Sequence, residues 1–135
     1  NSLFRERNQV LHIHDISGVE LVPGAERADI ERIRQSHYDL VSCSQVLEHV
    51  PFPLDFVKQM LPAVKTGSLI YLEVPHEALM RAHPGSLQLA TRKRHWHEHV
   101  NFFTELALRA LLERLDLVVV DVLPRQWISA GLRVR

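Results

Sequence analysis

The chain has 135 residues, 46% of them hydrophobic, which is enough for one core and too few for two ordinary domains. Its 16 basic and 16 acidic residues balance, so overall charge gives no argument for nucleic acid or an acidic membrane as a partner. The single cysteine excludes an internal disulfide and fits a cytoplasmic location best, and no stretch of about 18 apolar residues predicts a membrane span.

The first third of the chain predicts short elements. Residues 10–16 alternate apolar and polar side chains, which predicts a strand. A Pro-Gly turn pair lies within residues 19–29, where we expect a short edge strand. Residues 30–35 suit a helical turn, and the apolar run over 38–42 predicts a further strand.

The middle of the chain predicts a helix followed by a buried strand. Apolar spacing indicates a helix over residues 51–64, opened by two prolines, which a first helical turn tolerates, and stopped by Gly67. Pro62 interrupts the pattern, so we expect the helix to be kinked or shortened there. Residues 68–74 then form an apolar strand closed by a proline.

The last part of the chain combines an irregular stretch with a helix and two strands. Residues 76–101 have no clear period and hold five of the nine histidines, and a long irregular insert is often functional. Thr104 is expected to cap a helix with one apolar face. Residues 117–122 predict a strand, with 127–134 as its antiparallel partner. This order predicts a single α/β domain with a mostly parallel sheet and flanking helices.

Two segments resemble a known family. Residues 38–51, Tyr-Asp-Leu-Val-Ser-Cys-Ser-Gln-Val-Leu-Glu-His-Val-Pro, resemble the fourth strand and following turn of class I S-adenosylmethionine (SAM)-dependent methyltransferases. Residues 97–104, His-Glu-His-Val-Asn-Phe-Phe-Thr, resemble a segment of a subgroup that includes sugar C-methyltransferases. The resemblance implies a Rossmann-like fold, SAM as cofactor and methyl transfer to a small-molecule acceptor, with a sugar as one candidate.

The resemblance also implies which residues bind the cofactor. Asp15, at the end of the second strand, would accept the ribose hydroxyls, with Glu20 as a rival for that role. Asp29 falls where the family often contacts the adenine amino group. For these acids a solvated turn is the alternative interpretation. The residues expected to border the methionine end of SAM are Ser42, Ser44 and Gln45.

The histidine-rich segment offers a general base. The resemblance gives this role to Glu98 or His99, and a histidine or a buried carboxylate suits removal of a proton from the acceptor. Two alternatives stay open. His95, His97 and His99 would share a face on a strand and could bind a metal ion, although no fourth ligand is evident. The other alternative is that the histidines are polar loop residues beside the core residues Phe102 and Phe103.

Three residues within the first matching segment are expected to have structural roles. Cys43 is expected to be a small buried apolar residue, since no base for a nucleophile is evident. Glu48 and His49 are expected to begin the helix that follows, where an acidic side chain suits the N-terminus.

The glycine-rich turn that usually approaches SAM is missing from this sequence, because no two of its five glycines form G-x-G. In the resembled family this turn precedes the second strand, so the simplest interpretation places the first strand and its turn upstream of Asn1. Residues 1–135 would then be an N-terminally incomplete domain. If the protein does start at Asn1, residues 10–16 would pair directly with 38–42, or a second chain would fill the gap.

The sequence therefore leaves open whether the chain alone is an enzyme. The alternatives to a methyltransferase are a non-catalytic α/β remnant or dimerising module, for which a homodimer is the expected state, and a histidine-based metal-binding domain.

Overall fold

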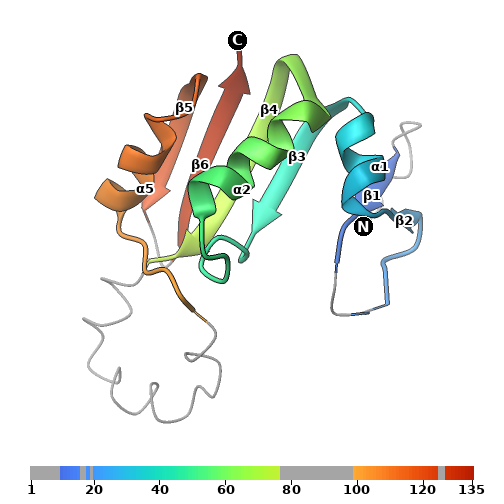
Figure 1. The fold of residues 1–135 in the computed structure, drawn as a ribbon, viewed down its shortest axis with the longest axis horizontal. Coiled ribbons are helices and arrows are strands. Elements are labelled where there is room, and N and C mark those ends of the chain that lie inside the picture. Colours follow the sequence, from blue (N-terminus) through green and yellow to red (C-terminus); the bar gives the residue numbers. More distant parts are fainter. Residues whose placement is uncertain (1–9, 16–17, 19, 77–98, 125–126) are drawn as a thin grey trace.

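The computed structural model describes residues 10–15, 18, 20–76, 99–124 and 127–135, and its main sheet has four strands (Figure 1). Their order across the sheet is β3 (Tyr38–Ser44), β4 (Val64–Pro75), β6 (Trp127–Val134) and β5 (Leu117–Pro124). β3 and β4 are parallel, whereas β6 is antiparallel to both of its neighbours. Three of the four strands therefore run in one direction, which confirms the predicted α/β domain with a mostly parallel sheet.

A second sheet holds only β1 (Leu11–Ile13) and β2 (Ala25–Arg27), which are parallel. Within the described ranges β1 does not pair with β3, so the direct pairing of residues 10–16 with 38–42 is not observed. A side-chain contact links the two parts instead, since His12 Nδ1 lies 2.5 Å from the hydroxyl of Tyr38.

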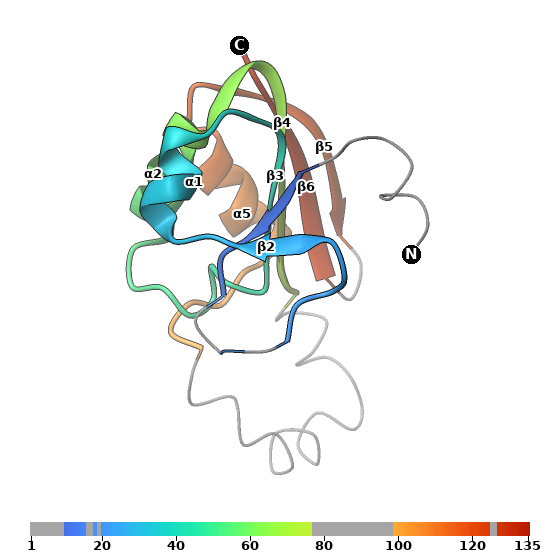
Figure 2. The same cartoon turned by 90° about the vertical axis from the view of Figure 1, so that its right-hand side faces the viewer.

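The helices lie on one side of the main sheet (Figure 2). They are α1 (Ile30–Gln35), α2 (Pro53–Met60), the short 3-10 helix η1 (Leu61–Ala63) and α5 (Glu105–Leu112). Pro62 lies in η1, which confirms that this proline shortens the preceding helix. In the part of the chain that the structure describes, no helix has the length and apolar character needed to cross a membrane.

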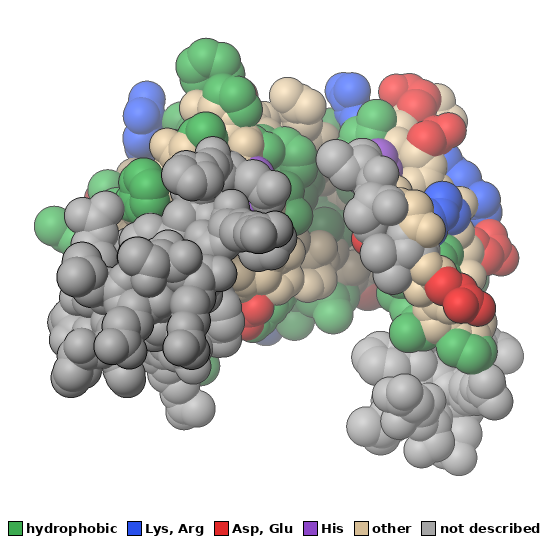
Figure 3. All heavy atoms as spheres, turned by 90° about the horizontal axis from the view of Figure 1, so that it is seen from below, with side chains coloured by type: hydrophobic (Ala, Val, Ile, Leu, Met, Phe, Trp, Pro, Cys, Tyr) green, Lys and Arg blue, Asp and Glu red, His purple; other side chains and the backbone are tan. Residues whose placement is uncertain are grey.

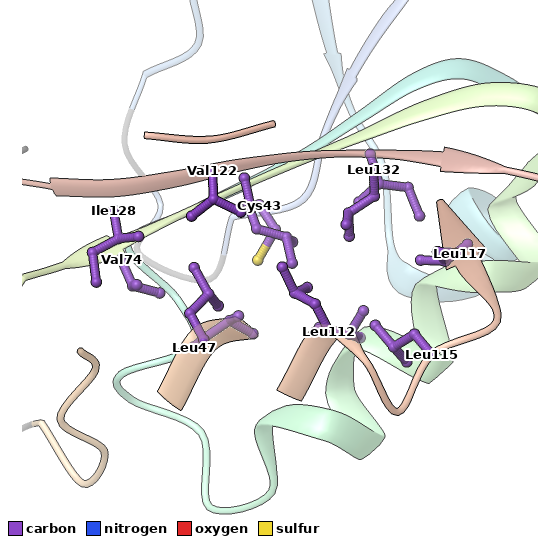
Figure 4. Packing of buried hydrophobic residues seen from close by; sticks show 14 of the residues in the cluster. Cys43, Leu47, Val74, Leu112, Leu115, Leu117, Val122, Ile128 and Leu132 are labelled. Carbon is purple, nitrogen blue, oxygen red and sulfur yellow. The ribbon is translucent and has the colours of Figure 1, made fainter. Parts of the chain in front are cut away.

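The core fills the space between the sheet and the helices (Figure 4). Along β4, Leu72 and Val74 are fully buried, while Leu69 on the other face is 40% exposed. This alternation follows from the period of two along a strand, so one face of the sheet packs and the other is open. Leu47 and Leu112 close the core from the opposite side.

The strand β4 is longer than the sequence predicts. β4 begins at Val64 rather than at Ser68, and the pairing with β3 is irregular between Tyr38 and Leu40. The hydroxyl of Ser68 donates to the carbonyl oxygen of Tyr38 over 2.7 Å and accepts from the backbone N–H of Lys65. These tertiary contacts extend the strand through a stretch that contains Gly67.

The C-terminal strand has the expected partner and a second one. β6 pairs antiparallel with β5, as predicted, and also with β4, so it lies inside the sheet. Thr104 caps α5 as predicted, because its hydroxyl accepts the backbone N–H of Ala107 at 3.2 Å.

Candidate functional site

Hydrogen bonds join the two segments that the sequence singles out. The carbonyl oxygen of Glu48 accepts from the backbone N–H groups of Val100, at 2.8 Å, and Asn101, at 3.1 Å. The side-chain amide of Asn101 donates to the carbonyl oxygens of Leu47, at 3.1 Å, and Val50, at 2.5 Å. We call these four hydrogen bonds the Asn101 clamp. They hold residues 99–101 against the turn that follows β3.

The turn is not the start of a helix. Residues 47–49 form a hydrogen-bonded turn, and α2 begins only at Pro53, so the prediction that Glu48 and His49 begin the helix is wrong. The physical reason is that the carbonyl oxygen of Glu48 is used by the Asn101 clamp, outside any helix. The placement of Glu48 is therefore a tertiary feature.

Glu48 is the buried acid of this region. It is only 1% exposed, and its Oε2 atom has no hydrogen-bond partner among the described residues. Burial raises the pKa of its carboxyl group, and the neighbouring imidazoles of His49 and His99 oppose that increase. An unpartnered buried carboxylate oxygen is unusual and points to a ligand or a proton.

Two histidines lie beside this carboxyl group. His49 Nε2 is 3.8 Å from Glu48 Oε1, and its side chain is 37% exposed. The ring of His99 meets that of His49 edge to face, with centroids 4.7 Å apart. One ligand atom from each of the three residues lies within 4.8 Å of the others. The arrangement could move a proton or hold a metal ion.

A second polar group gathers where β3 and β4 end. Ser44 Oγ donates to Glu73 Oε1 at 2.7 Å, and the hydroxyl of Tyr71 donates to Glu73 Oε2 at the same distance. Gln45 donates to Glu73 Oε1 at 3.4 Å, and the Gln45 backbone has a positive φ of 57°. The hydrogen bond from Ser44, followed by that from Tyr71, lowers the pKa of Glu73, so this carboxylate stays ionised near neutral pH.

Both groups lie at the end of the molecule where β3 and β4 finish. Figure 3 views that end, where histidine, acidic and hydrophobic side chains reach the surface. In open α/β sheets this is the end of the strands at which ligands bind. Ser44 and Gln45 lie at this end, and Ser42 precedes them on β3 and pairs in register with Tyr71. Their cofactor-binding roles stay predictions.

The expected ribose and adenine residues lie in the part of the chain that carries β1, β2 and α1. The carbonyl oxygen of Asp15 accepts from the guanidinium of Arg27 at 2.8 Å. Asp29 is the N-cap of α1, because its carboxylate accepts the backbone N–H of Arg32 at 2.7 Å. Glu20 is exposed. None of these contacts tests the cofactor roles, which stay predictions.

Several predicted residues lie outside the described residues. They are His95, His97 and Glu98. His99 is described, and it faces Glu48 and His49. Sequence reasoning missed Asn101 and the burial of Glu48. The only signal in the sequence is that Asn101 lies between apolar residues. That pattern does not indicate which carbonyl oxygens accept hydrogen bonds from its amide.

Cys43 has the role that the sequence predicts. It is 5% exposed within the core, and burial, followed by the charge of Glu48, raises the pKa of its thiol to about 11. The thiol is therefore protonated at neutral pH, which confirms the interpretation as a buried apolar residue.

Comparison with known proteins supports the family resemblance. Residues 3–122 match the family model described as a methyltransferase domain. The chain is 27% identical over 131 residues to the ubiquinone biosynthesis O-methyltransferase of Shewanella sp. (strain ANA-3). This alignment covers 85% of this chain and 51% of that protein. The enzyme of the same name from Aeromonas salmonicida (strain A449) is 27% identical over 89 residues, which cover 63% of this chain and 37% of that protein. The chain thus spans about half the length, or less, of these relatives.

Solved structures show the same fold. A candidate methyltransferase of Bacillus halodurans C-125 superimposes with a TM-score of 0.54 and 16% identity, over 76% of this chain and 46% of that chain. A SAM-dependent methyltransferase of Thermotoga maritima gives a TM-score of 0.55 and 12% identity, over 82% of this chain and 64% of that chain. With the match of the family model to residues 3–122, these findings show that the chain belongs to the methyltransferase domain family.

Proposed function

We propose that this domain takes part in the transfer of a methyl group from SAM to a small-molecule acceptor. One observation carries the proposal: the Asn101 clamp holds His99 against the turn after β3, at the edge where β3 and β4 end. That edge is where an open α/β sheet binds its ligands. Membership of the methyltransferase domain family supports the reaction type.

The residues at this edge suit parts of SAM. The cofactor supplies a methyl group on a positively charged sulfur atom. The ionised Glu73 carboxylate, with Ser44 and Gln45 beside it, offers negative charge and polar contacts for the methionine end. Asp15 would accept the ribose hydroxyls, and Asp29 would contact adenine in addition to capping α1.

The acceptor needs to lose a proton as the new bond forms. We propose His99, or Glu98 next to it, as the group that removes this proton, because a neutral imidazole accepts a proton near physiological pH. Ser42 would border the reacting end. The domain would otherwise act by alignment, which in well-oriented reactions lowers the barrier by several kcal/mol, up to about 7–11 kcal/mol.

For the acceptor we propose a small molecule with an ionisable hydroxyl group. The support is the name of two relatives, which are ubiquinone biosynthesis O-methyltransferases. A sugar is the alternative, supported by the resemblance of residues 97–104 to sugar C-methyltransferases. We propose neither nucleic acid nor a membrane surface as a partner, since the formal net charge is zero.

Calorimetric titration of the 135-residue chain with S-adenosylhomocysteine tests the proposal. We expect binding that Asp15→Ala abolishes and that Asp116→Ala, a change at a 90% exposed carboxylate paired with Arg135, leaves intact. Absence of binding by a chain whose circular dichroism shows it to be folded would overturn the proposal for this chain.

The second candidate is a dimerising module without catalysis. The observation that favours it is the outer edge of β3, which pairs with no other strand in the described ranges apart from β4. An unpaired edge strand can add a strand from a second chain. Sedimentation equilibrium separates the candidates, because a dimer that does not bind S-adenosylhomocysteine supports the module.

A further inference from the structure

Among the described residues, no contact explains why the carboxyl group of Glu48 is buried. Its Oε2 atom is buried without a hydrogen-bond partner among the described residues, although the residue is 1% exposed. A buried polar atom in this state costs free energy unless something binds it. Protonation would remove the charge but would still leave a polar group to satisfy, so a bound cation is the more complete explanation.

The neighbours of this carboxyl group are metal ligands. His49 Nε2 lies 3.8 Å from Glu48 Oε1, and ligand atoms of Glu48, His49 and His99 all lie within 4.8 Å of one another. Two ligand atoms that each lie about 2.1 Å from a tetrahedral ion are about 3.4 Å apart. The three side chains therefore need only a small closure to reach one ion.

We propose that Glu48, His49 and His99 form a binding site for a divalent transition-metal ion of the zinc class. Two imidazoles and one carboxylate are ligands that zinc takes in sites that keep an open position, whereas magnesium and calcium prefer oxygen ligands alone. The 37% exposure of the His49 side chain gives the ion access from solvent.

The Asn101 clamp holds the backbone that carries the three proposed ligands. It fixes the backbone on both sides of the cluster, since Glu48 accepts from Val100 and Asn101 while the Asn101 amide holds Leu47 and Val50. Groups that orient the ligands of a metal site contribute to its affinity. Asn101 is thus a positioning residue for the ion and does not bind it.

The site differs from the histidine array that the sequence suggests. Of that array, the structure describes His99, and the ligands proposed beside it come from the turn after β3. Metal binding here does not depend on the methyl transfer proposed above. If that function also holds, His99 would bind the ion and would not act as a free base. The ion would then promote loss of the acceptor proton, because it would lower the pKa of the acceptor hydroxyl group.

Titration of the 135-residue chain with Zn²⁺ alone tests the inference, using protein without a histidine tag that has been dialysed against a chelator. We expect binding by calorimetry, and Co²⁺ substitution should give the visible absorption of a tetrahedral site. Glu48→Gln, His49→Ala and His99→Ala should each weaken Zn²⁺ binding more than about 100-fold, and Asn101→Ala about 10-fold, as supporting groups do elsewhere. His37→Ala, at an exposed histidine, is the matched control and should bind as the wild type does.

Two results would overturn the inference. One is a folded chain that binds no Zn²⁺. The other is binding that survives Glu48→Gln and His49→Ala but is lost in His95→Ala or His97→Ala, which would assign the metal to the histidine array. The side chain of His49 is exposed, so His49→Ala keeps the test decisive even if a change at the buried Glu48 affects folding. Binding of S-adenosylhomocysteine is measured separately, so failure of either proposal can be distinguished from failure of the other.

Discussion

The side-chain amide of Asn101 donates a hydrogen bond of 3.1 Å to the carbonyl oxygen of Leu47, 54 positions earlier in the chain. A second hydrogen bond from the same amide reaches Val50. One side chain thus ties a segment before α5 to the turn after β3. The relationship also fixes where His99 lies relative to Glu48.

Replacing Asn101 should therefore cost stability. In Asn101→Ala both side-chain hydrogen bonds are lost and two partly buried carbonyl groups lose a partner, so we expect the free energy of unfolding to fall by about 1–3 kcal/mol. Asn101→Asp should be similarly destabilised, because an ionised carboxylate cannot donate. Urea denaturation measures both, with Leu106→Ala at a 78% exposed position as the control. Wild-type stability in Asn101→Ala would show that the clamp contributes nothing.

Glu73 should make stability depend on pH. Its folded pKa is lowered, first by the hydrogen bond from Ser44, so the stabilisation is present above the unfolded pKa and is lost as pH falls through the folded pKa. Glu73→Gln should thus reduce the free energy of unfolding at pH 7 by about 1 kcal/mol, and the difference should disappear as the pH falls below the lowered pKa of Glu73.

Denaturant unfolding at several pH values tests whether the stability difference between the wild type and Glu73→Gln decreases as the pH falls. Glu105→Gln is the comparison, because Glu105 forms an i,i+4 pair with Arg109 on the surface and should contribute only about 0.3–0.5 kcal/mol. A difference for Glu73→Gln that grows as the pH falls would contradict the prediction.

Two glycines should respond to alanine in opposite directions. Gly67 has a φ of 86°, which strains any side chain, so Gly67→Ala should destabilise the protein by about 1–2 kcal/mol. Gly131 lies in β6 with ordinary backbone, and an added Cβ would meet Val120 at 3.9 Å. Gly131→Ala should therefore be neutral or stabilising by up to about 1 kcal/mol. Thermal unfolding of both variants compares them directly, and equal melting temperatures would refute the argument.

The Cys43 thiol should be unreactive in the folded protein. Burial raises its pKa to about 11, so little thiolate forms at pH 8 and reagents cannot reach the sulfur atom. An aromatic disulfide reagent should label the chain slowly in buffer and fully in urea. Rapid labelling in buffer would mean that the strand around Cys43 opens often.

Local patterns predict the elements of this fold better than its site. The apolar run over residues 68–74 and the cap at Thr104 are properties of short segments, and the structure has both the strand and the cap. The early start of β4 depends on a hydrogen bond between Ser68 and Tyr38, which no local pattern contains. The backbone of Glu48 likewise bonds to Val100 and Asn101, which lie far along the chain, so its surroundings could not be inferred from its neighbours in sequence.

The position of β6 between β4 and β5 has a consequence for folding during synthesis. The ribosome makes both neighbours before it makes the strand that joins them, so β5 cannot pair within this sheet until residues 127–134 have emerged. Contacts between segments far apart in the chain form slowly, and unpaired strands invite aggregation in the meantime. A chain cut before Trp127 would lose the strand that pairs with both β4 and β5, so completion of the four-stranded sheet depends on β6.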